Sequence, residues 1–200
     1  MSRKARIGID IDGVLANFNH SFREFIHEHT DVRLPEITDT YPDAWDYHKR
    51  AGVMKQDDSK LWKLINDSQT FWKNIPAYSD ATLFLEWAAW LPSEVDVYFI
   101  TSRPGKTAKA QSEAWLQKNG WGYDFHPTVL ISSKKGECAS ALELTHFIDD
   151  KNENVLDVYH NGPRSCDLVM LARPWNSIVE DVPRIATINE FRRSVEEFIQ

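Results

Sequence analysis

Acidic residues interrupt an apolar segment near the start of the chain. The segment RIGIDIDGV, residues 6–14, places Asp10 and Asp12 among isoleucines and directly before Gly13. Alternating isoleucines favour a buried β-strand, where a bare charge is costly unless it is paired, protonated or bound to a metal. The two carboxylates therefore indicate chemistry at the end of this strand.

Polar residues also stand at or just after the ends of three later apolar segments, VDVYFI, TVLI and THFI. In chain order these residues are the pairs Thr101–Ser102, Lys134–Lys135 and Asp149–Asp150. Ligands of open α/β sheets bind beyond the carboxyl ends of the strands, so we expect all of these groups to meet in one crevice. Clustered carboxylates without a nearby Cys or His favour a hard cation such as Mg²⁺.

This set of groups suits phosphoryl transfer. One aspartate, Asp10, can attack phosphorus and form an aspartyl-phosphate. Asp12 can protonate the leaving oxygen and then deprotonate the attacking water. Thr101 and the backbone N–H groups of the following turn can hold phosphate oxygens, and a lysine supplies a point charge for the same oxygens.

The segments that must position these groups alternate between strand and helix. Apolar runs predict strands at 6–12, 95–103, 127–133, 145–150 and 166–172. Apolar periodicity and capping signals predict helices at 17–30, 57–66, 80–91, 106–121 (with Gly120 as its C-cap), 134–144, 151–162 and 185–200. This alternation predicts an α/β fold with a parallel sheet covered by helices on both faces.

A segment between the first strand and the later ones departs from this pattern. Residues 17–78 are rich in Trp and in loops, and contain no predicted strand; residues 31–45 read as loop. We expect a small, mainly helical cap at 17–78, inserted after the first strand, on a core domain made of 1–16 and 79–200. Eight tryptophans occur in the chain, and most should fill the core, while one or two can line a pocket for a flat ligand.

The composition bounds the class of protein. Two hundred residues suggest one domain with an insertion. A net charge of −7 and a pI of about 5.5 argue against a nucleic acid partner, because phosphate backbones call for a basic face. The chain has no apolar stretch typical of a signal peptide or membrane span, and its two cysteines, Cys138 and Cys166, form no CxxC motif. We therefore expect a soluble cytoplasmic protein, of an oligomeric state that the sequence does not specify.

Four short segments resemble a known set of motifs. DIDGV (10–14), TSR (101–103), KG (135–136) and IDD (148–150) are similar, in order and spacing, to the motifs of the haloacid dehalogenase-like (HAD) phosphatases. DIDGVLANF, FWKNIPAYSDA, FITSRPG, FIDDKNENV and MLARPWN resemble segments of the 5'(3')-deoxyribonucleotidases. The resemblance implies a Rossmann-like HAD fold and a Mg²⁺-dependent phosphomonoesterase. The implied substrate is a nucleoside monophosphate.

The same resemblance implies roles for single residues. Asp10 would be the nucleophile and Asp12 the acid and base. Mg²⁺ would bind Asp10, the backbone carbonyl of Asp12 and an acid of the fourth motif, with Asp150 preferred over Asp149. The phosphate-binding residues would be Thr101, Ser102 and Lys135, which the K-G step favours over Lys134. Phe18 would stack on the base.

Alternatives remain at several points. Phe18 also lies on an apolar helical face, so core packing is as well supported as base stacking. Arg103 departs from the TSP form common in these nucleotidases, and is either an extra phosphate contact or a surface residue. The substrate is alternatively a sugar phosphate or a nucleic acid 3'-phosphate. A phosphate-binding relative without turnover is a further alternative, although both aspartates of the first motif are present.

Overall fold

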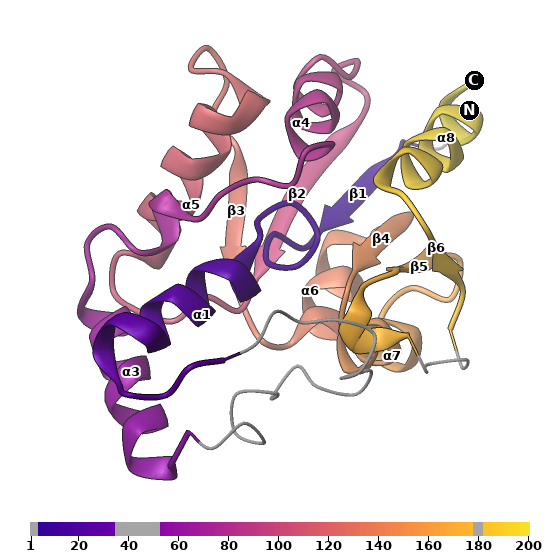
Figure 1. Ribbon diagram of the computed structural model, residues 1–200. Helices are drawn as coiled ribbons and strands as arrows, with labels where there is room; N and C mark the ends of the chain where they lie inside the picture. Colours follow the sequence, from indigo (N-terminus) through magenta and orange to yellow (C-terminus); the bar gives the residue numbers. More distant parts are fainter. Residues whose placement is uncertain (1–3, 35–52, 178–181) are drawn as a thin grey trace.

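The computed structural model describes residues 4–34, 53–177 and 182–200. The described strands form one six-stranded sheet in the order β3-β2-β1-β4-β5-β6, and all five pairings are parallel (Figure 1). The strands are β1 (Arg6–Ile9), β2 (Asp96–Thr101), β3 (Thr128–Ile131), β4 (His146–Asp149), β5 (Asp167–Leu171) and β6 (Arg184–Ile185). The predicted parallel α/β sheet is therefore confirmed.

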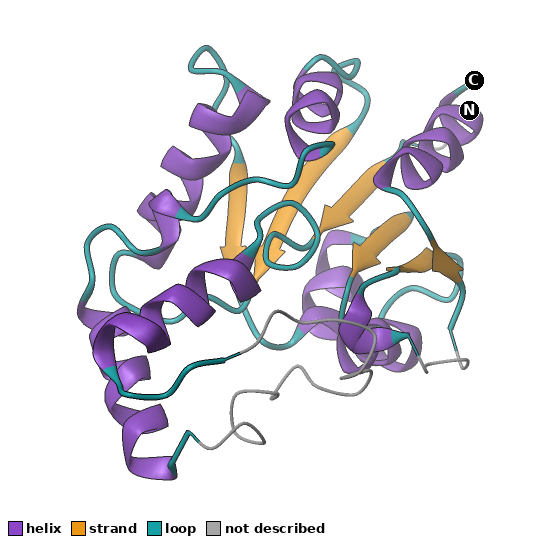
Figure 2. Ribbon diagram, viewed as in Figure 1, coloured by secondary structure: helices purple, strands orange, loops and turns teal. Residues whose placement is uncertain are grey.

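Helices surround the sheet (Figure 2). They are α1 (Phe18–His29), α3 (Lys55–Asp67), α4 (Ala81–Ala89), α5 (Ala108–Leu116), α6 (Lys135–Leu142), α7 (Asn152–Asn161) and α8 (Ile188–Ile199). Three single turns complete the described elements: η1 (Trp72–Asn74), the π-helical η2 (Gln117–Trp121) and η3 (Pro174–Asn176).

The central strand shows why both faces of the sheet are covered. Successive side chains of a strand point to opposite faces. Ile7 and Ile9 are fully buried in the main core, which also contains apolar residues of α4, α5 and α8. Gly8 faces the other side, where an added Cβ would lie 2.4 Å from the Leu144 side chain. Leu144 belongs to a second, smaller core that α6 and α7 help to build.

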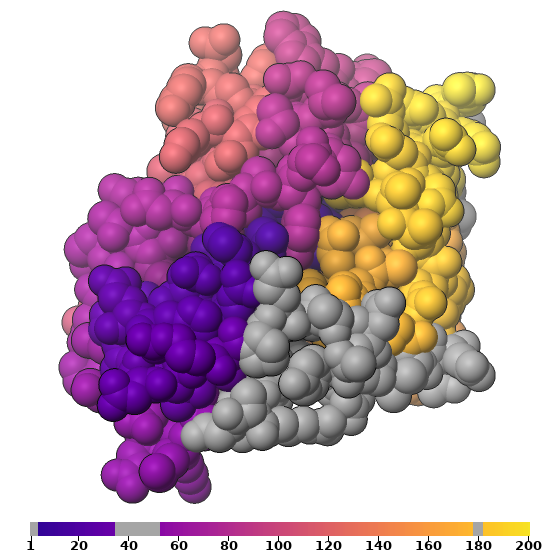
Figure 3. All heavy atoms as spheres, in the orientation of Figure 1, coloured from indigo at the N-terminus to yellow at the C-terminus, as the bar shows by residue number. Residues whose placement is uncertain are grey.

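The chain between β1 and α4 makes no strand among its described residues; it forms α1, α3 and η1. These elements lie beyond the carboxyl ends of β1 and β2 (Figure 1), and α1 and α3 form a lobe beside the sheet-bearing part (Figure 3). The predicted helical insertion after the first strand is thus present. Its limits at 17–78 stay a prediction, and most of the loop predicted at 31–45 lies outside the described residues.

Two predicted helices end or begin elsewhere. The last helix begins at Ile188 instead of 185, because Arg184 and Ile185 pair with β5 as the short strand β6. Thr187 and Glu190 then cap the helix with reciprocal hydrogen bonds. The α-helical part of the segment predicted as a helix at 106–121 ends at Leu116. The π-helical turn η2 follows it, and Gly120 in that turn adopts a φ of +133°. In the described part of the chain, no helix is both long and apolar enough to cross a membrane.

Candidate active site

Carboxylates gather at the carboxyl edge of the sheet, as the strand ends predicted. Asp10 follows β1, Asp149 closes β4, and Asp150 comes next in the chain. Because β1 and β4 are neighbours, one carboxylate oxygen from each of these aspartates lies within 4.8 Å of the others. All three residues are buried. Buried like charges at this distance repel strongly, so the cluster requires cations or protons.

Lys135, the first residue of α6, brings one cation to this cluster. Its side chain is fully buried, forms an ion pair with Asp10 and donates to the carbonyl oxygen of Ile100. Its Nζ lies 3.5 Å from Oδ2 of Asp149. Lys134 instead points to the surface, where its Nζ lies 2.7 Å from Oε1 of Glu137. Of the two lysines considered from the sequence, the structure brings Lys135 to the aspartates.

The crowding shows in the acid–base properties of the cluster. Burial raises the pKa of Asp10 to about 7, against the opposing effect of Lys135, and Asp149 and Asp12 add to the rise. Burial, followed by the charges of Asp149 and Asp10, raises the pKa of Asp150 well above its usual value. Burial would lower the pKa of Lys135, but the two carboxylates beside it raise that pKa above normal. The lysine is therefore charged at neutral pH.

Asp149 and Asp150 have different surroundings. Asp149 accepts hydrogen bonds from the backbone N–H of Lys151 (2.9 Å) and from the side-chain amide of Asn154 (3.0 Å to each oxygen). Asp150 accepts one hydrogen bond through Oδ2, from the indole N–H of Trp175 (2.7 Å). Within the described residues, no donor contacts its Oδ1. Asp150 thus keeps an oxygen available for a ligand, whereas Asp149 is held by α7 and by Lys135.

The donor set fits a hard divalent cation. The clustered groups of Asp10, Asp149 and Asp150 supply oxygen atoms only, which suits Mg²⁺ better than a thiolate- or imidazole-binding metal. Within the described part of the chain, Asp150 has a free carboxylate oxygen and Asp10 lines the cavity, so these two residues are better candidates for metal ligands than Asp149. The backbone carbonyl of Asp12 stays a predicted third protein ligand.

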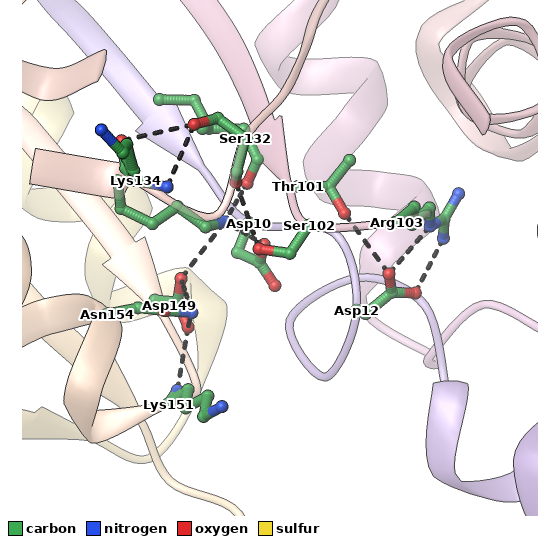
Figure 4. Close-up of polar contacts among 12 residues, drawn as sticks. Asp10, Asp12, Thr101, Ser102, Arg103, Ser132, Lys134, Asp149, Lys151 and Asn154 are labelled. Carbon is green, nitrogen blue, oxygen red and sulfur yellow. Dashed lines mark hydrogen bonds and ion pairs between the residues drawn. The ribbon is translucent and has the colours of Figure 1, made fainter. Parts of the chain in front are cut away.

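Asp12 lies in the loop after β1, and its carboxylate points toward Arg103 and away from Asp149 (Figure 4). Its carboxylate accepts hydrogen bonds from Nε (2.8 Å) and Nη2 (2.9 Å) of Arg103, and Thr101 Oγ1 lies 3.4 Å from its Oδ2. Arg103 is 1% exposed, so it is not the surface residue that the sequence allowed as one alternative. The neighbouring Ser102 is exposed and donates to the carbonyl oxygen of Ser132 (3.1 Å).

A cavity of about 310 Å³ opens onto these groups. Its polar wall includes Asp10, Asp12, Thr101, Ser102, Arg103 and Asp150. Its apolar wall comes mainly from the insertion, through Phe18, Trp62 and Trp72, and Pro104 adds to it after β2. The predicted site residues therefore meet at one cavity, apart from Lys135 and Asp149, which lie behind its wall.

Phe18 contacts the cavity mainly as part of a packed aromatic cluster. It is 5% exposed, and its ring stacks on Phe22 (5.2 Å between centroids), Trp72 (5.8 Å) and Trp62 (6.1 Å). Trp62 is only half-buried and also lines the cavity, so it is the better candidate for contact with a ligand. Sequence reasoning allowed a pocket role for one or two tryptophans without choosing between them; Trp45 lies outside the described residues.

Sequence reasoning gave no role to three residues near the end of β5. Arg173 donates to the carbonyl oxygens of Gly13 (2.6 Å) and Val14 (3.0 Å), which fixes the loop after β1. Trp175 holds the Asp150 carboxylate, and Asn176 donates to the Asp150 carbonyl oxygen (2.8 Å). The segment MLARPWN was the only signal for these contacts, through its resemblance to the nucleotidases.

The sequence matches no known family profile and no curated protein. Solved structures do resemble the fold. A haloacid dehalogenase-like hydrolase from Streptococcus pneumoniae has a TM-score of 0.61 at 13% identity, over 97% of this chain and 100% of its own. A HAD-hydrolase from Bacillus subtilis, bound to magnesium, has a TM-score of 0.57 at 11% identity, over 97% and 99%.

A third similar structure is a HAD family hydrolase from Deinococcus radiodurans with bound phosphate and sodium. It has a TM-score of 0.59 at 14% identity, over 99% of this chain and 97% of its own. These likenesses extend over nearly the whole of each chain at low identity, so they concern the fold. With the six-stranded parallel sheet, they show that this protein has the Rossmann-like α/β fold of the haloacid dehalogenase-like hydrolases.

Proposed function

We propose that this protein is a Mg²⁺-dependent phosphomonoesterase that forms an aspartyl-phosphate on Asp10. The observation that carries the proposal is the position of this carboxylate. It lines the cavity, pairs with the buried cation of Lys135 and belongs to an all-oxygen cluster suited to a divalent ion. A nucleophile, a counter-charge and a metal site therefore meet where a phosphate ester can enter.

In this mechanism, an ionised oxygen of Asp10 attacks phosphorus and the bond to the leaving oxygen breaks. Asp12 gives its proton to that oxygen. Asp12 then takes a proton from a water molecule, which attacks the phosphorus, and the bond between Asp10 and phosphorus breaks to release inorganic phosphate. Asp10, Asp150 and the Asp12 carbonyl would hold Mg²⁺, which supplies charge stabilisation for the phosphoryl oxygens.

The residues around these groups have supporting roles. Thr101 and Ser102 line the cavity beside Asp12 and would donate to phosphoryl oxygens. Lys135 pairs with the Asp10 carboxylate, and its positive charge would stabilise a phosphoryl group bonded to that carboxylate. Asp149 would orient this lysine. The Deinococcus hydrolase binds phosphate and the Bacillus hydrolase binds magnesium, which supports a phosphate ester and Mg²⁺ as ligands of this protein.

The proposed substrate is a nucleoside monophosphate. A phosphate at Asp10 would leave the rest of the ester beside the aromatic wall, where Trp62 presents a half-buried ring. Stacking on such a ring is favourable for every base, because each has a π-face. The two free cysteines are typical of a reducing compartment, which supports a cytoplasmic setting, and the acidic pI disfavours a nucleic acid end as substrate.

A panel of phosphate esters with Mg²⁺, read out as released phosphate, tests this function. It should contain ribo- and deoxyribonucleoside 5'- and 3'-monophosphates, sugar phosphates, a 3'-phosphorylated oligonucleotide and p-nitrophenyl phosphate. Nucleoside monophosphates should give the highest kcat/KM, and excess EDTA should abolish turnover. Preference for sugar phosphates would change the substrate but keep the mechanism. Complete inactivity, p-nitrophenyl phosphate included, would overturn the proposal in favour of a silent phosphate-binding protein.

The Asp10→Asn variant provides the control for the nucleophile. A neutral amide cannot attack phosphorus, so turnover should be lost while the fold is kept. Beryllium fluoride should bind the wild-type protein in a crystal structure with beryllium bonded to the Asp10 carboxylate. A variant that kept a tenth of wild-type turnover would show that another group is the nucleophile.

A further inference from the structure

Arg103 donates hydrogen bonds to both carboxylate oxygens of Asp12. Its Nε lies 2.8 Å from Oδ2 and its Nη2 lies 2.9 Å from Oδ1, so the two planar groups meet in a bidentate pair (Figure 4). Charge-assisted pairs of this kind fix orientation as well as position. Asp12 lies on the loop after β1, and Arg103 follows β2. The pair therefore ties together two loops that neighbouring strands bring to the same sheet edge.

Contacts with Ser112 and with two tryptophan rings fix the guanidinium of Arg103. Its Nη1 donates to Ser112 Oγ (3.0 Å), and the Ser112 hydroxyl donates to the carbonyl oxygen of Ala108 (2.8 Å). Its central carbon lies 5.2 Å from the ring centre of Trp72 and 5.9 Å from that of Trp115. Arginine stacks favourably on such rings. The guanidinium therefore has one well-defined position between α5 and the insertion.

The side chains of Arg103 and Asp12 differ in solvent exposure. The Arg103 side chain is 0% exposed, whereas that of Asp12 is 13% exposed. Each of the three guanidinium nitrogens already has a partner, Asp12 or Ser112. Arg103 also lines the cavity, but its side chain has no exposed surface and its nitrogens are engaged, so a ligand that enters the cavity has the more exposed Asp12 carboxylate to contact.

We infer that Arg103 is a positioning residue that aims the Asp12 carboxylate at the leaving oxygen, and that it acts on the reaction only through Asp12. This inference rests on the proposed function and gives Arg103 a different role from that of a phosphate ligand. The Asp12 carboxylate points toward Arg103 and away from Asp10 (Figure 4), and the bidentate pair holds it in this orientation at the cavity.

A double-mutant cycle tests the inference. The four proteins are the wild type, Arg103→Gln, Asp12→Asn and the double variant, each assayed with phenyl phosphate and with p-nitrophenyl phosphate. Arg103→Gln should lower kcat/KM for phenyl phosphate by about 10–100-fold, a large part of what general acid–base catalysis contributes. The loss should be smaller for p-nitrophenyl phosphate, whose leaving group needs less protonation. In the Asp12→Asn background, Arg103→Gln should change kcat/KM by less than about 2-fold, because residues that act as a unit are not additive.

Inhibition by inorganic phosphate separates the two roles of Arg103. A positioning residue leaves the inhibition constant of phosphate within about 2-fold of the wild-type value in Arg103→Gln. A phosphate ligand would raise that constant about tenfold or more, the usual cost of a lost charged hydrogen bond, and its loss would add to that of Asp12→Asn. That second pattern would overturn the inference.

Matched variants guard against misfolding. Arg192 has the same kinds of contact away from the site: its Nε lies 2.8 Å from Oε1 of Glu196, and its guanidinium lies 5.4 Å from the ring centre of Trp87. Arg192→Gln should leave both activities unchanged.

If Arg103→Gln does not fold, Ser112→Ala provides a second test. It loosens the guanidinium of Arg103 while keeping its charge, and should give a smaller loss of kcat/KM with the same leaving-group dependence. An equal loss for both substrates in Ser112→Ala would count against positioning. An inactive wild type would overturn the proposed function, whereas an active wild type with additive losses would overturn only the role of Arg103.

Discussion

Lys135 Nζ bridges two carboxylates, forming an ion pair with Asp10 and lying 3.5 Å from Oδ2 of Asp149. The parallel pairing of β1 with β4 brings the two carboxylates together, and the start of α6 brings the lysine between them. One cation does not balance the charge of the three clustered acids at this edge. The remaining charge must be met by bound protons or by a divalent ion.

This geometry predicts different outcomes for the two adjacent lysines. Lys135→Met should lower kcat/KM at least about 100-fold, as expected for loss of a preorganised charge at the reacting centre. It should also lower the melting temperature without metal, because the buried carboxylates lose their counter-charge. Lys134→Met removes only a surface pair with Glu137 and should change neither quantity. Steady-state kinetics and thermal melts of both variants measure this. Equal effects in the two variants would contradict the assignment.

Strand ends account for the part of the site that could be predicted from the sequence. Asp10, Thr101 and Asp149 each stand where an apolar run stops, and a parallel sheet places such points on one edge. The K-G step favoured Lys135, and the structure brings this lysine to the aspartates. Local pattern and topology were sufficient for these positions.

Contacts that depend on tertiary packing could not be predicted in this way. The pairing of Arg103 with Asp12 joins residues 91 positions apart, and nothing near Arg103 in the sequence indicates its partner. Trp175 likewise reaches Asp150 from a turn after β5. The strand β6 is only two residues long, too short for a periodic signal, so the sequence pattern assigns its second residue, Ile185, to the last helix.

The raised acid pKa values predict how metal binding depends on pH. Burial raises the pKa of Asp10 to about 7, so the folded protein without metal binds a proton that the unfolded chain has lost. Its stability should therefore fall as the pH rises from about 4 to 7. Mg²⁺ needs the ionised carboxylates, so the increase in melting temperature on adding it should be larger at pH 8 than at pH 5.5. Thermal melts with Mg²⁺ or EDTA at both pH values measure this. An equal shift at the two pH values would argue against a metal at Asp10.

Two glycines with similar positive φ angles offer a test of the space beside Asp150. Gly13 and Gly122 have φ values of +82° and +80°. A Cβ on Gly13 would lie 2.1 Å from Oδ2 of Asp150, whereas a Cβ on Gly122 would meet nothing within 4 Å. Gly13→Ala should displace Asp150, abolish turnover and weaken the stabilisation by Mg²⁺. Gly122→Ala should keep turnover and lose only stability, about 1–3 kcal/mol, the usual cost of an unfavourable backbone region. Full activity in Gly13→Ala would show that the position of Asp150 is not needed.

The aromatic wall predicts which ring recognises the base. Phe18 is 5% exposed and stacks on three rings, so Phe18→Ala should lower the melting temperature and reduce turnover of nucleotides and p-nitrophenyl phosphate alike. Trp62 is half-buried at the cavity, so Trp62→Ala should lose mainly ligand contact. Stacking contributes about 1–3 kcal/mol per base, which corresponds to a loss of roughly 5- to 150-fold in kcat/KM for nucleotides.

The ratio of the two activities distinguishes these roles for Trp62 and Phe18. In Trp62→Ala, the ratio of kcat/KM for a nucleoside monophosphate to that for p-nitrophenyl phosphate should fall, because the small ester reacts at Asp10 without a base to stack. In Phe18→Ala the same ratio should stay near the wild-type value, because a packing defect affects the whole cavity. Trp62→Phe keeps an aromatic face and should restore most of the ratio. A falling ratio in Phe18→Ala, with an unchanged melting temperature, would instead make Phe18 the stacking residue. A constant ratio in both variants would remove the support that the aromatic wall gives to a nucleotide substrate.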